Sequence, residues 1–318
     1  METIATLTAL SLAQLILVLG LSPLISGIIK KTKARLQYRR GASVFQPYAD
    51  LAKLFHKEVV RSTTSSWVFV ATPYILFTTT LVIILLVPTA FAPVPFHWAG
   101  DIITVIYLFA FGRFFLALVG LDTASAFGGL GSSREMSIAS IVEPAMLLAI
   151  FTVSVTAGST NLSTIVLKLS TTPASMANPS HILALAGLCI VTIAETGRIP
   201  VDNPSTHLEL TMIHEAMILE YSGRYLAFVE WASQVKLFIF LALIVNMFFP
   251  LGMATTLSAP DLIVGVAALL GKIVVLAVGV AVVESTNAKL RLFRVPDLLM
   301  VAFMLSLLAL ILFFIIGS

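Results

Sequence analysis

The sequence predicts an all-α membrane protein that crosses the bilayer eight times and has both termini outside. Of its 318 residues, 58% are hydrophobic and 11% are charged, whereas a soluble domain has roughly 25% charged residues. So few charges cannot cover a surface that faces water, and most of the surface must therefore face lipid. We expect residues 1–318 to form a single membrane domain.

Eight apolar runs are long enough to cross a bilayer as helices, which takes about 20 residues each. We expect these spans near residues 5–29, 67–92, 102–121, 137–157, 180–198, 225–250, 261–284 and 298–317.

Lysine and arginine decide the orientation, because both gather in short cytoplasmic loops. Fifteen of the 19 basic residues lie in alternate connections, and the intervening connections hold only Lys168. The cytoplasmic loops are therefore predicted at about 30–66, 122–136, 199–224 and 285–297.

The first cytoplasmic loop is predicted to contain an amphipathic helix. After Pro47, three apolar residues (Leu51, Leu54 and Phe55) recur at the i, i+3, i+4 spacing of one helix face. Such a helix would lie on the membrane surface or against a partner protein. Alternatively, the basic residues serve only topology and anionic lipid. The residues assigned here to docking are Arg39, Arg40, Asp50 and Lys53.

Several charged residues lie inside the predicted spans, where a charge near the bilayer centre costs at least ~2.5–3.5 kcal/mol. Such groups point into the protein, pair with one another or line a water-filled path. We favour a proton or ion path over static ion pairs that only orient the helices, because the charges occur on several spans. The residues assigned to this path are Arg113, Glu143, Glu195, Lys236, Lys272 and Glu284; Glu230 is a further intramembrane charge.

The connection from 194 to 224 concentrates charge between two apolar spans and is the expected working centre. Ser205 or Thr206 can cap a helix that continues without a breaker to about Leu219. This helix would present carboxylates to a partner or to a buried, water-filled cavity. The docking and central-loop residues are Arg134, Arg198, Asp202, Glu209, Glu215 and Glu220.

We expect no metal, no cofactor and no catalytic residue in this chain, and no nucleic-acid partner. Cys189 is the single cysteine, which excludes an intrachain disulfide and any Cys-ligated iron–sulfur or zinc site. His207 and His214 are seven residues apart, a spacing too wide to chelate one ion easily. The glycine-rich run at 128–133 lacks the lysine of a phosphate loop and is expected to form a turn.

Four segments together resemble the subunit 1 family of respiratory complex I and of the related membrane-bound nickel–iron hydrogenases. They are RLQYRRGASVFQPYADLAKLFHKE (35–58), SREMSIASIVEP (133–144), ETGRIPVD (195–202) and EYSG (220–223). Three further segments (113–127, 231–236 and 284–292) resemble the hydrogenase branch, which includes the energy-converting, hydrogenase-4 and formate-hydrogenlyase types. Ser205 and His207 stand where complex I members typically carry carboxylates.

The resemblance implies a non-catalytic membrane subunit of a hydrogenase complex in the cytoplasmic (inner) membrane of a prokaryote. Its partners would be the hydrogenase large and small subunits, iron–sulfur subunits and antiporter-like membrane subunits, with the nickel–iron centre and iron–sulfur clusters in those partners. This chain would link hydrogen chemistry to proton or sodium translocation. The alternatives are the quinone-site subunit of a complex I-type NADH:quinone oxidoreductase and a stand-alone ion transporter.

Overall fold

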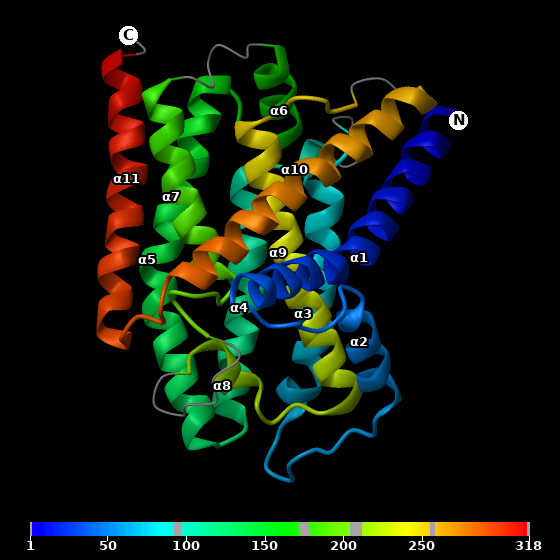
Figure 1. The fold of residues 1–318 in the computed structure, drawn as a ribbon, viewed down its shortest axis with the longest axis vertical. Coiled ribbons are helices and arrows are strands. Elements are labelled where there is room, and N and C mark those ends of the chain that lie inside the picture. The colour runs from blue at the N-terminus through cyan, green and yellow to red at the C-terminus, as the bar shows by residue number, and fades with distance from the viewer. Residues whose placement is uncertain (1, 92–96, 172–177, 204–211, 255–257, 317–318) are drawn as a thin grey trace.

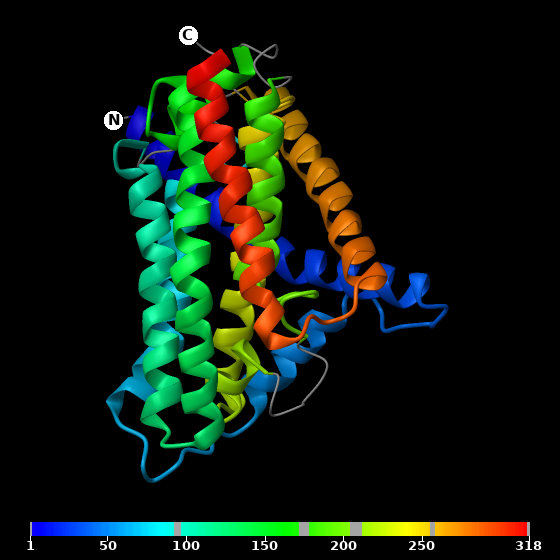
Figure 2. The ribbon, with the colours of Figure 1, turned by 90° about the vertical axis from the view of Figure 1, so that its left-hand side faces the viewer.

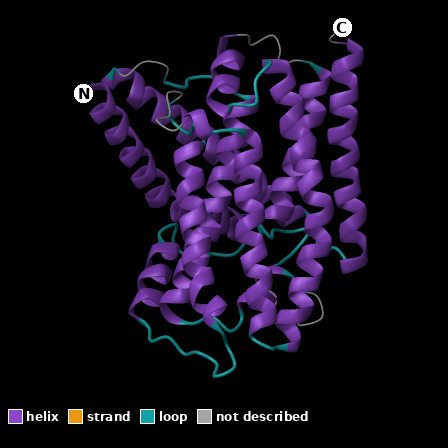
Figure 3. Cartoon of the chain, turned by 180° about the vertical axis from the view of Figure 1, so that it is seen from behind, coloured by secondary structure: helices purple, strands orange, loops and turns teal. Residues whose placement is uncertain are grey.

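The computed structural model describes residues 2–91, 97–171, 178–203, 212–254 and 258–316, and this part of the chain is built from helices (Figure 3). Seven of its helices are long and apolar enough to cross a membrane. The remaining predicted span, 180–198, corresponds to α7 (Pro179–Glu195), which is shorter at 17 residues. The all-α, multi-spanning prediction is confirmed, whereas the count of eight and the sidedness of the termini stay predictions. The seven long helices are α1 (Glu2–Leu36), α3 (Trp67–Leu86), α4 (Ile102–Asp122), α5 (Ala126–Ala157), α9 (Gly223–Phe248), α10 (Ala259–Thr286) and α11 (Val295–Ile316).

The helices α3, α4, α5, α7, α9 and α11 run roughly side by side along the long axis, and α10 crosses them obliquely (Figures 1 and 2). In the packing, α11 contacts α7 and α5, α4 contacts α3 and α5, and α1 contacts α10. Both ends of the chain lie at one end of the molecule, while α2 (Gln46–His56) and α8 (His214–Ile218) lie toward the other (Figure 1).

Helix α9 is the centre of the core. Every residue from Leu237 to Phe248 is buried, and Phe238 and Phe240 are among the largest fully buried side chains. A helix that is apolar all round is covered on all sides. Because Lys236 directly precedes this buried run, its ammonium group lies inside the bundle and needs a partner there.

Helix α1 bends part-way along its length (Figure 2), and it contains Pro23. Proline has no N–H, so the carbonyl of residue i−4, here Leu19, loses its helical donor. The indole Nε1 of Trp231 on α9 donates a hydrogen bond to that carbonyl at 3.2 Å. The Tyr48 hydroxyl donates to the neighbouring carbonyl of Gly20. The carbonyl groups at the bend are therefore hydrogen-bonded by side chains of α9 and α2, which join these helices to α1.

The helix predicted in the first cytoplasmic loop is confirmed as α2, which begins one residue before Pro47. Its apolar face packs on α9 of the same chain. Leu51 is buried, and the Phe55 ring makes edge contacts with Phe228 at 5.3 Å and with Trp231 at 6.2 Å. The apolar face is thus partly covered within this chain, by α9, while Phe55 stays partly exposed.

The turn expected at 128–133 is wrong, because these residues are helical and α5 already begins at Ala126. The cytoplasmic location of the connection at about 122–136 stays a prediction. The Ser125 side chain accepts a hydrogen bond from the Gly128 N–H at 3.2 Å and so caps the helix. A Cβ atom at Gly128 would lie 2.3 Å from the Gly120 carbonyl oxygen on α4. The glycines therefore serve close packing of two helices, which offsets their poor helix propensity.

This packing predicts that Gly128→Ala destabilises the protein while Gly129→Ala does not. At Gly128 the added methyl meets backbone, which cannot move aside, so we expect a loss of about 1–3 kcal/mol. At Gly129 the nearest atom outside its own turn, Leu121 Cδ2, is 4.0 Å away. Melting temperatures in detergent measure both variants, and equal stability of the two would contradict the close α4–α5 contact.

Candidate functional site

Glu195 occupies the last turn of α7, and the way this helix ends fixes its position. Gly197 has φ +58°, the left-handed conformation that glycine adopts at low cost. Its N–H donates to the Ala194 carbonyl at 3.1 Å, and the Arg198 N–H donates to the Ile193 carbonyl at 3.0 Å. These two bonds are a Schellman motif. A carboxylate near a helix C-terminus is unfavourable in the helix field, so Glu195 requires cations from other helices.

Two cations meet Glu195 inside the bundle. The Arg113 guanidinium from α4 pairs with Oε1, and the Lys236 ammonium from α9 lies 2.9 Å from Oε2. Arg113 also contacts two carboxylates on α5, Glu143 at 2.5 Å and Glu135 at 3.5 Å. We call these five residues the Arg113 cluster. With three acidic and two basic members, the cluster carries a formal charge of −1 when all are ionised.

The members of the Arg113 cluster differ in their access to the outside. The side chains of Glu195 and Arg113 are 1% and 4% exposed, whereas that of Glu143 is 34% exposed. The cluster therefore runs from a buried carboxylate at the end of α7 to a partly open one on α5. Breaking a buried ion pair by removing one partner is costly, about 3–5 kcal/mol.

The structure brings together four of the six predicted path residues, Arg113, Glu143, Glu195 and Lys236. Glu135 was missed because the sequence placed it in a loop, although it lies eight residues before Glu143 on the same helix. The Lys272 ammonium instead donates hydrogen bonds to the carbonyls of Phe249 and Leu251, at 3.0 and 2.9 Å.

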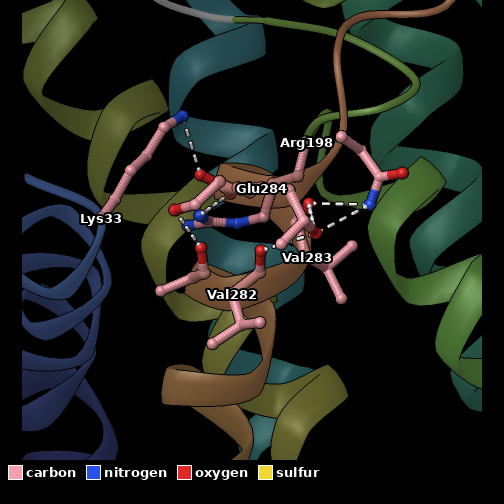
Figure 4. A network of polar contacts seen from close by, with 9 residues as sticks. Lys33, Arg198, Val282, Val283 and Glu284 are labelled. Carbon is pink, nitrogen blue, oxygen red and sulfur yellow. Dashed lines mark hydrogen bonds and ion pairs between the residues drawn. The ribbon is translucent and has the colours of Figure 1, made fainter. Parts of the chain in front are cut away.

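Glu284, the sixth predicted path residue, joins three parts of the chain at a separate point. Its Oε1 accepts a hydrogen bond from Arg198 Nη1 at 2.7 Å, and its Oε2 lies 3.1 Å from Lys33 Nζ (Figure 4). Lys33 lies on α1, Glu284 on α10 and Arg198 in the turn after α7. This triad ties the start of the central loop to two helices, and Lys33 is a member that the sequence did not indicate.

Asp202 is 2% exposed and organises the described part of the central loop. Its Oδ2 accepts hydrogen bonds from the N–H groups of Ile213 and His214, at 3.2 and 3.0 Å. Its Oδ1 lies 2.7 Å from Lys289 Nζ, in the loop between α10 and α11. Asp202 therefore fixes the start of α8 and ties it to the loop between α10 and α11.

The helix predicted from Ser205 or Thr206 to Leu219 is wrong where it can be compared. Residues 212 and 213 are not helical, and α8 begins only at His214. Arg134 Nη1 donates to the Met212 carbonyl at 2.7 Å, and Asp202 takes the next two N–H groups. These side chains replace the helical hydrogen bonds. Glu209 and His207 lie outside the described residues.

The other residues assigned to docking lie on the surface. They belong to the connection between α1 and α3 and to the end of the central loop, and all are exposed: Arg39, Arg40, Asp50, Lys53 and Glu220.

A cavity of about 640 Å³ opens between α1, α8, α9 and the turn after α7, and we call it the outer cavity. Its charged lining residues carry both signs. A second cavity of about 60 Å³, the inner cavity, lies among α3, α4 and α9 and reaches Arg113, Glu195 and Lys236. One water molecule needs a cavity of only about 10–15 Å³, so both cavities have room for water. The charged residues of the outer cavity are Lys30, Lys33, Arg39, Arg198, Glu215, Glu230 and Glu284.

Glu215, next to the start of α8, titrates near neutral pH. Burial raises the pKa of its carboxyl to about 7, and the negative charges of Glu230 and Asp202 add to the effect, while Lys30 opposes it. Burial also lowers the pKa of the adjacent His214 below its ordinary value. The rim of the outer cavity thus contains a carboxyl group, that of Glu215, whose protonation can change near physiological pH.

Comparison with known proteins shows which family the chain belongs to. A family model described as NADH dehydrogenase matches residues 9–315. The chain belongs to the NADH dehydrogenase subunit 1 family. Formate hydrogenlyase subunit 4 of Escherichia coli (strain K12) is 36% identical over 298 residues, covering 94% of this chain and 96% of that protein. Hydrogenase-4 component C of the same strain is 35% identical over 304 residues, covering 95% of each chain.

Other proteins share less of the chain, or only the fold. NADH-quinone oxidoreductase subunit 8 of Rhodothermus marinus is 27% identical over 232 residues, 69% of this chain and 66% of that protein. A chain in the structure of the membrane-bound sulfane sulfur reductase, an archaeal respiratory membrane complex, superposes with a TM-score of 0.81 at 19% identity. It covers 95% of this chain and 99% of that one, which shows a common fold. The predicted membership of the subunit 1 family is confirmed.

The pKa of Glu215 predicts a pH-dependent stability. Because folding raises this pKa from its ordinary 4.5 to about 7, the folded state binds the proton more tightly than the unfolded state. Stability therefore falls as pH rises between these two values. Glu215→Gln removes this slope, so the variant should gain stability relative to the native chain as pH rises from about 5 to 8.

The measurement is the melting temperature in detergent across this pH range. Glu220→Gln is the matched control, because Glu220 is an exposed carboxyl in the same loop. Parallel pH dependence of the native and Glu215→Gln proteins would contradict the assignment.

Proposed function

We propose that this chain is the membrane-anchoring and coupling subunit of a multi-subunit nickel–iron hydrogenase complex in a prokaryotic cytoplasmic membrane. The named relatives that cover nearly all of the chain are a formate hydrogenlyase subunit and a hydrogenase-4 component. The observation that carries the coupling role is the Arg113 cluster, in which one arginine holds three carboxylates from two helices. An anchor alone does not require such a cluster inside an apolar bundle.

The redox cofactors are assigned to partner subunits. Within the described residues, no group of three His, Cys, Asp or Glu side chains could hold a metal ion, and Cys189 is the single cysteine of the sequence. We therefore place the nickel–iron centre and the iron–sulfur clusters in the hydrogenase large and small subunits and in iron–sulfur subunits, with antiporter-like subunits beside this chain in the membrane.

The electrostatics of the Arg113 cluster suit it to relay charge. In a low-dielectric interior each ionised group depends on its neighbours, because desolvation disfavours a lone charge. A proton that reaches Glu195 weakens its attraction to Arg113 and Lys236 and changes the preferred state of Glu143 across the arginine. Glu143 is the most exposed of the three carboxylates. A group on a neighbouring subunit could therefore respond to a change in its charge. Redox events at the cytoplasmic loops would thereby be transmitted to ion movement in the membrane.

Replacing Glu195 or Glu143 with glutamine tests the coupling role, because glutamine keeps the shape and removes the titratable charge. We expect hydrogenase activity with an artificial dye to survive in membranes, since that chemistry belongs to partner subunits. Ion pumping per hydrogen turned over should collapse, by at least about tenfold. The measurement is vesicle acidification or sodium uptake during hydrogenase turnover.

Lys168→Gln is the control, because Lys168 lies on α6 (Leu162–Thr171), where its ammonium donates to the Ala157 carbonyl at 2.8 Å, far in sequence from the cluster. Intact pumping by both glutamine variants in an assembled complex would leave the Arg113 cluster a structural feature and remove the proposed coupling role.

The exposed charges of the first cytoplasmic loop are proposed as the docking surface for the soluble redox module. Arg39 and Arg40 on this loop are both exposed, so their positive charges are available to a partner. The double substitution Arg39→Glu and Arg40→Glu reverses the charge there and should release hydrogenase activity into the soluble fraction. Fractionation followed by a dye assay measures this, and fully membrane-bound activity would contradict docking at this loop.

A quinone-site subunit of a complex I-type enzyme is the second candidate. The outer cavity of about 640 Å³ favours it, because it is large enough for an organic ring system. Quinone reduction that is lost on substitution of its lining residues would favour this alternative over a hydrogenase.

A further inference from the structure

His214 is the one described residue that lines all three of the cavities around the central loop. These are the outer cavity, the inner cavity, and a small cavity of about 10 Å³ between α5 and the central loop. Thr196, Val229 and Ser233 are shared by the outer and inner cavities only. None of these three side chains titrates near neutral pH, whereas an imidazole does.

The position of His214 is fixed by its backbone and by the turn behind it. Its N–H donates to Asp202 Oδ2 at 3.0 Å, and it is the first residue of α8. A Cβ atom on Gly197 would lie 3.6 Å from His214 Cβ and 3.8 Å from its Cγ. The turn that ends α7 beyond Glu195 therefore lies directly against the histidine, within van der Waals distance of the base of its ring.

His214 has different charged groups on its two sides. Toward the outer cavity lie Glu215 and Glu230, beside the rim that reaches the surface at Arg39. Toward the inner cavity lie Arg113, Glu195 and Lys236. A proton that passes from the outer water to the Arg113 cluster by this route must therefore pass the one titratable residue that both cavities share.

We propose that His214 is the proton carrier between the outer cavity and the Arg113 cluster. This inference rests on the proposed coupling function. One ring nitrogen accepts a proton from water in the outer cavity, forming the imidazolium. The other nitrogen then releases its proton to water in the inner cavity beside Glu195, which restores a neutral imidazole of the other tautomer. One proton enters and one leaves, and rotation of the ring restores the starting tautomer.

The charged groups around His214 favour this role. Burial lowers its pKa, and Lys236 on α9 acts in the same direction. Glu135 on α5, Asp202 in the central loop and Glu230 on α9 oppose this shift. The ring is consequently neutral at neutral pH, ready to accept a proton, while three carboxylates stabilise the transient imidazolium.

The test uses the complete complex in inverted membrane vesicles. Dye-linked hydrogenase activity that stays with the vesicles reports assembly, and a pH-sensitive dye reports acidification. A sodium ionophore is present to separate direct proton transfer from sodium-driven acidification. We expect His214→Gln to retain dye-linked activity and to lose at least about tenfold of its acidification per turnover. His56→Gln is the matched control, because His56 is exposed at the end of α2, and its pumping should be unchanged.

A second variant separates proton transfer from structural support. His214→Ala leaves space beside the outer cavity, so free imidazole added to the vesicles should restore acidification several-fold. Pyrazole, which has the same ring size but is not protonated near neutral pH, should not. A purely structural histidine would be rescued by both compounds or by neither, and either result overturns the proposal.

The result at Glu195 distinguishes the two claims. If Glu195→Gln stops pumping and His214→Gln does not, His214 is no carrier and the coupling function stands. If Glu195→Gln itself pumps normally, the coupling function fails, and the carrier proposal, which rests on it, fails too.

Discussion

The burial of Glu195 between two cations is the interaction on which the rest of the structure depends. A carboxylate with a side chain 1% exposed carries a desolvation cost of several kcal/mol, which only close opposite charges and hydrogen bonds offset. Arg113 and Lys236 supply those charges from α4 and α9, and neither of them could itself be buried in an apolar bundle without a carboxylate. The three groups thus require one another. Their helices must therefore pack in the register that brings the end of α7 beside the middle of α4 and the middle of α9.

The packing around this cluster follows from that requirement. Glycines on α4 and α5 allow the two helices that carry Arg113 and its α5 carboxylates to approach within backbone contact. The Schellman motif after α7 stops that helix at Glu195 and turns the chain toward α10, where Glu284 holds Arg198. Asp202 then fixes α8 so that His214 lies where the cavities meet. Charged side chains from four parts of the chain make contacts around the central loop: Lys33, Arg134, Asp202 and Lys289.

Much of this could be predicted from the sequence, because composition and hydrophobic length alone decide which segments enter a membrane. The convergence of Arg113, Glu143, Glu195 and Lys236 could also be predicted, since a charge inside a span must find a partner within the protein.

What could not be predicted depends on contacts between segments far apart in the chain. A glycine-rich stretch such as 128–133 is compatible with a turn and with a close contact between helices. The contact with Gly120 on α4, which the local sequence does not contain, favours the helix contact. The break before His214 depends on Asp202 and Arg134, which local propensity does not include. Likewise, Lys33 seemed to belong to a loop because its partner Glu284 lies 251 residues away.

The central claim is that Glu195 changes its protonation state while the complex turns over. Infrared difference spectra between the hydrogen-reduced and the oxidised complex measure this most directly, because a protonated carboxyl group and a carboxylate absorb at separate frequencies. The account predicts a carboxyl band that appears or disappears with reduction, responds to deuterium exchange and is absent from the Glu195→Gln complex. A difference spectrum that is the same with and without the Glu195 carboxyl would contradict it.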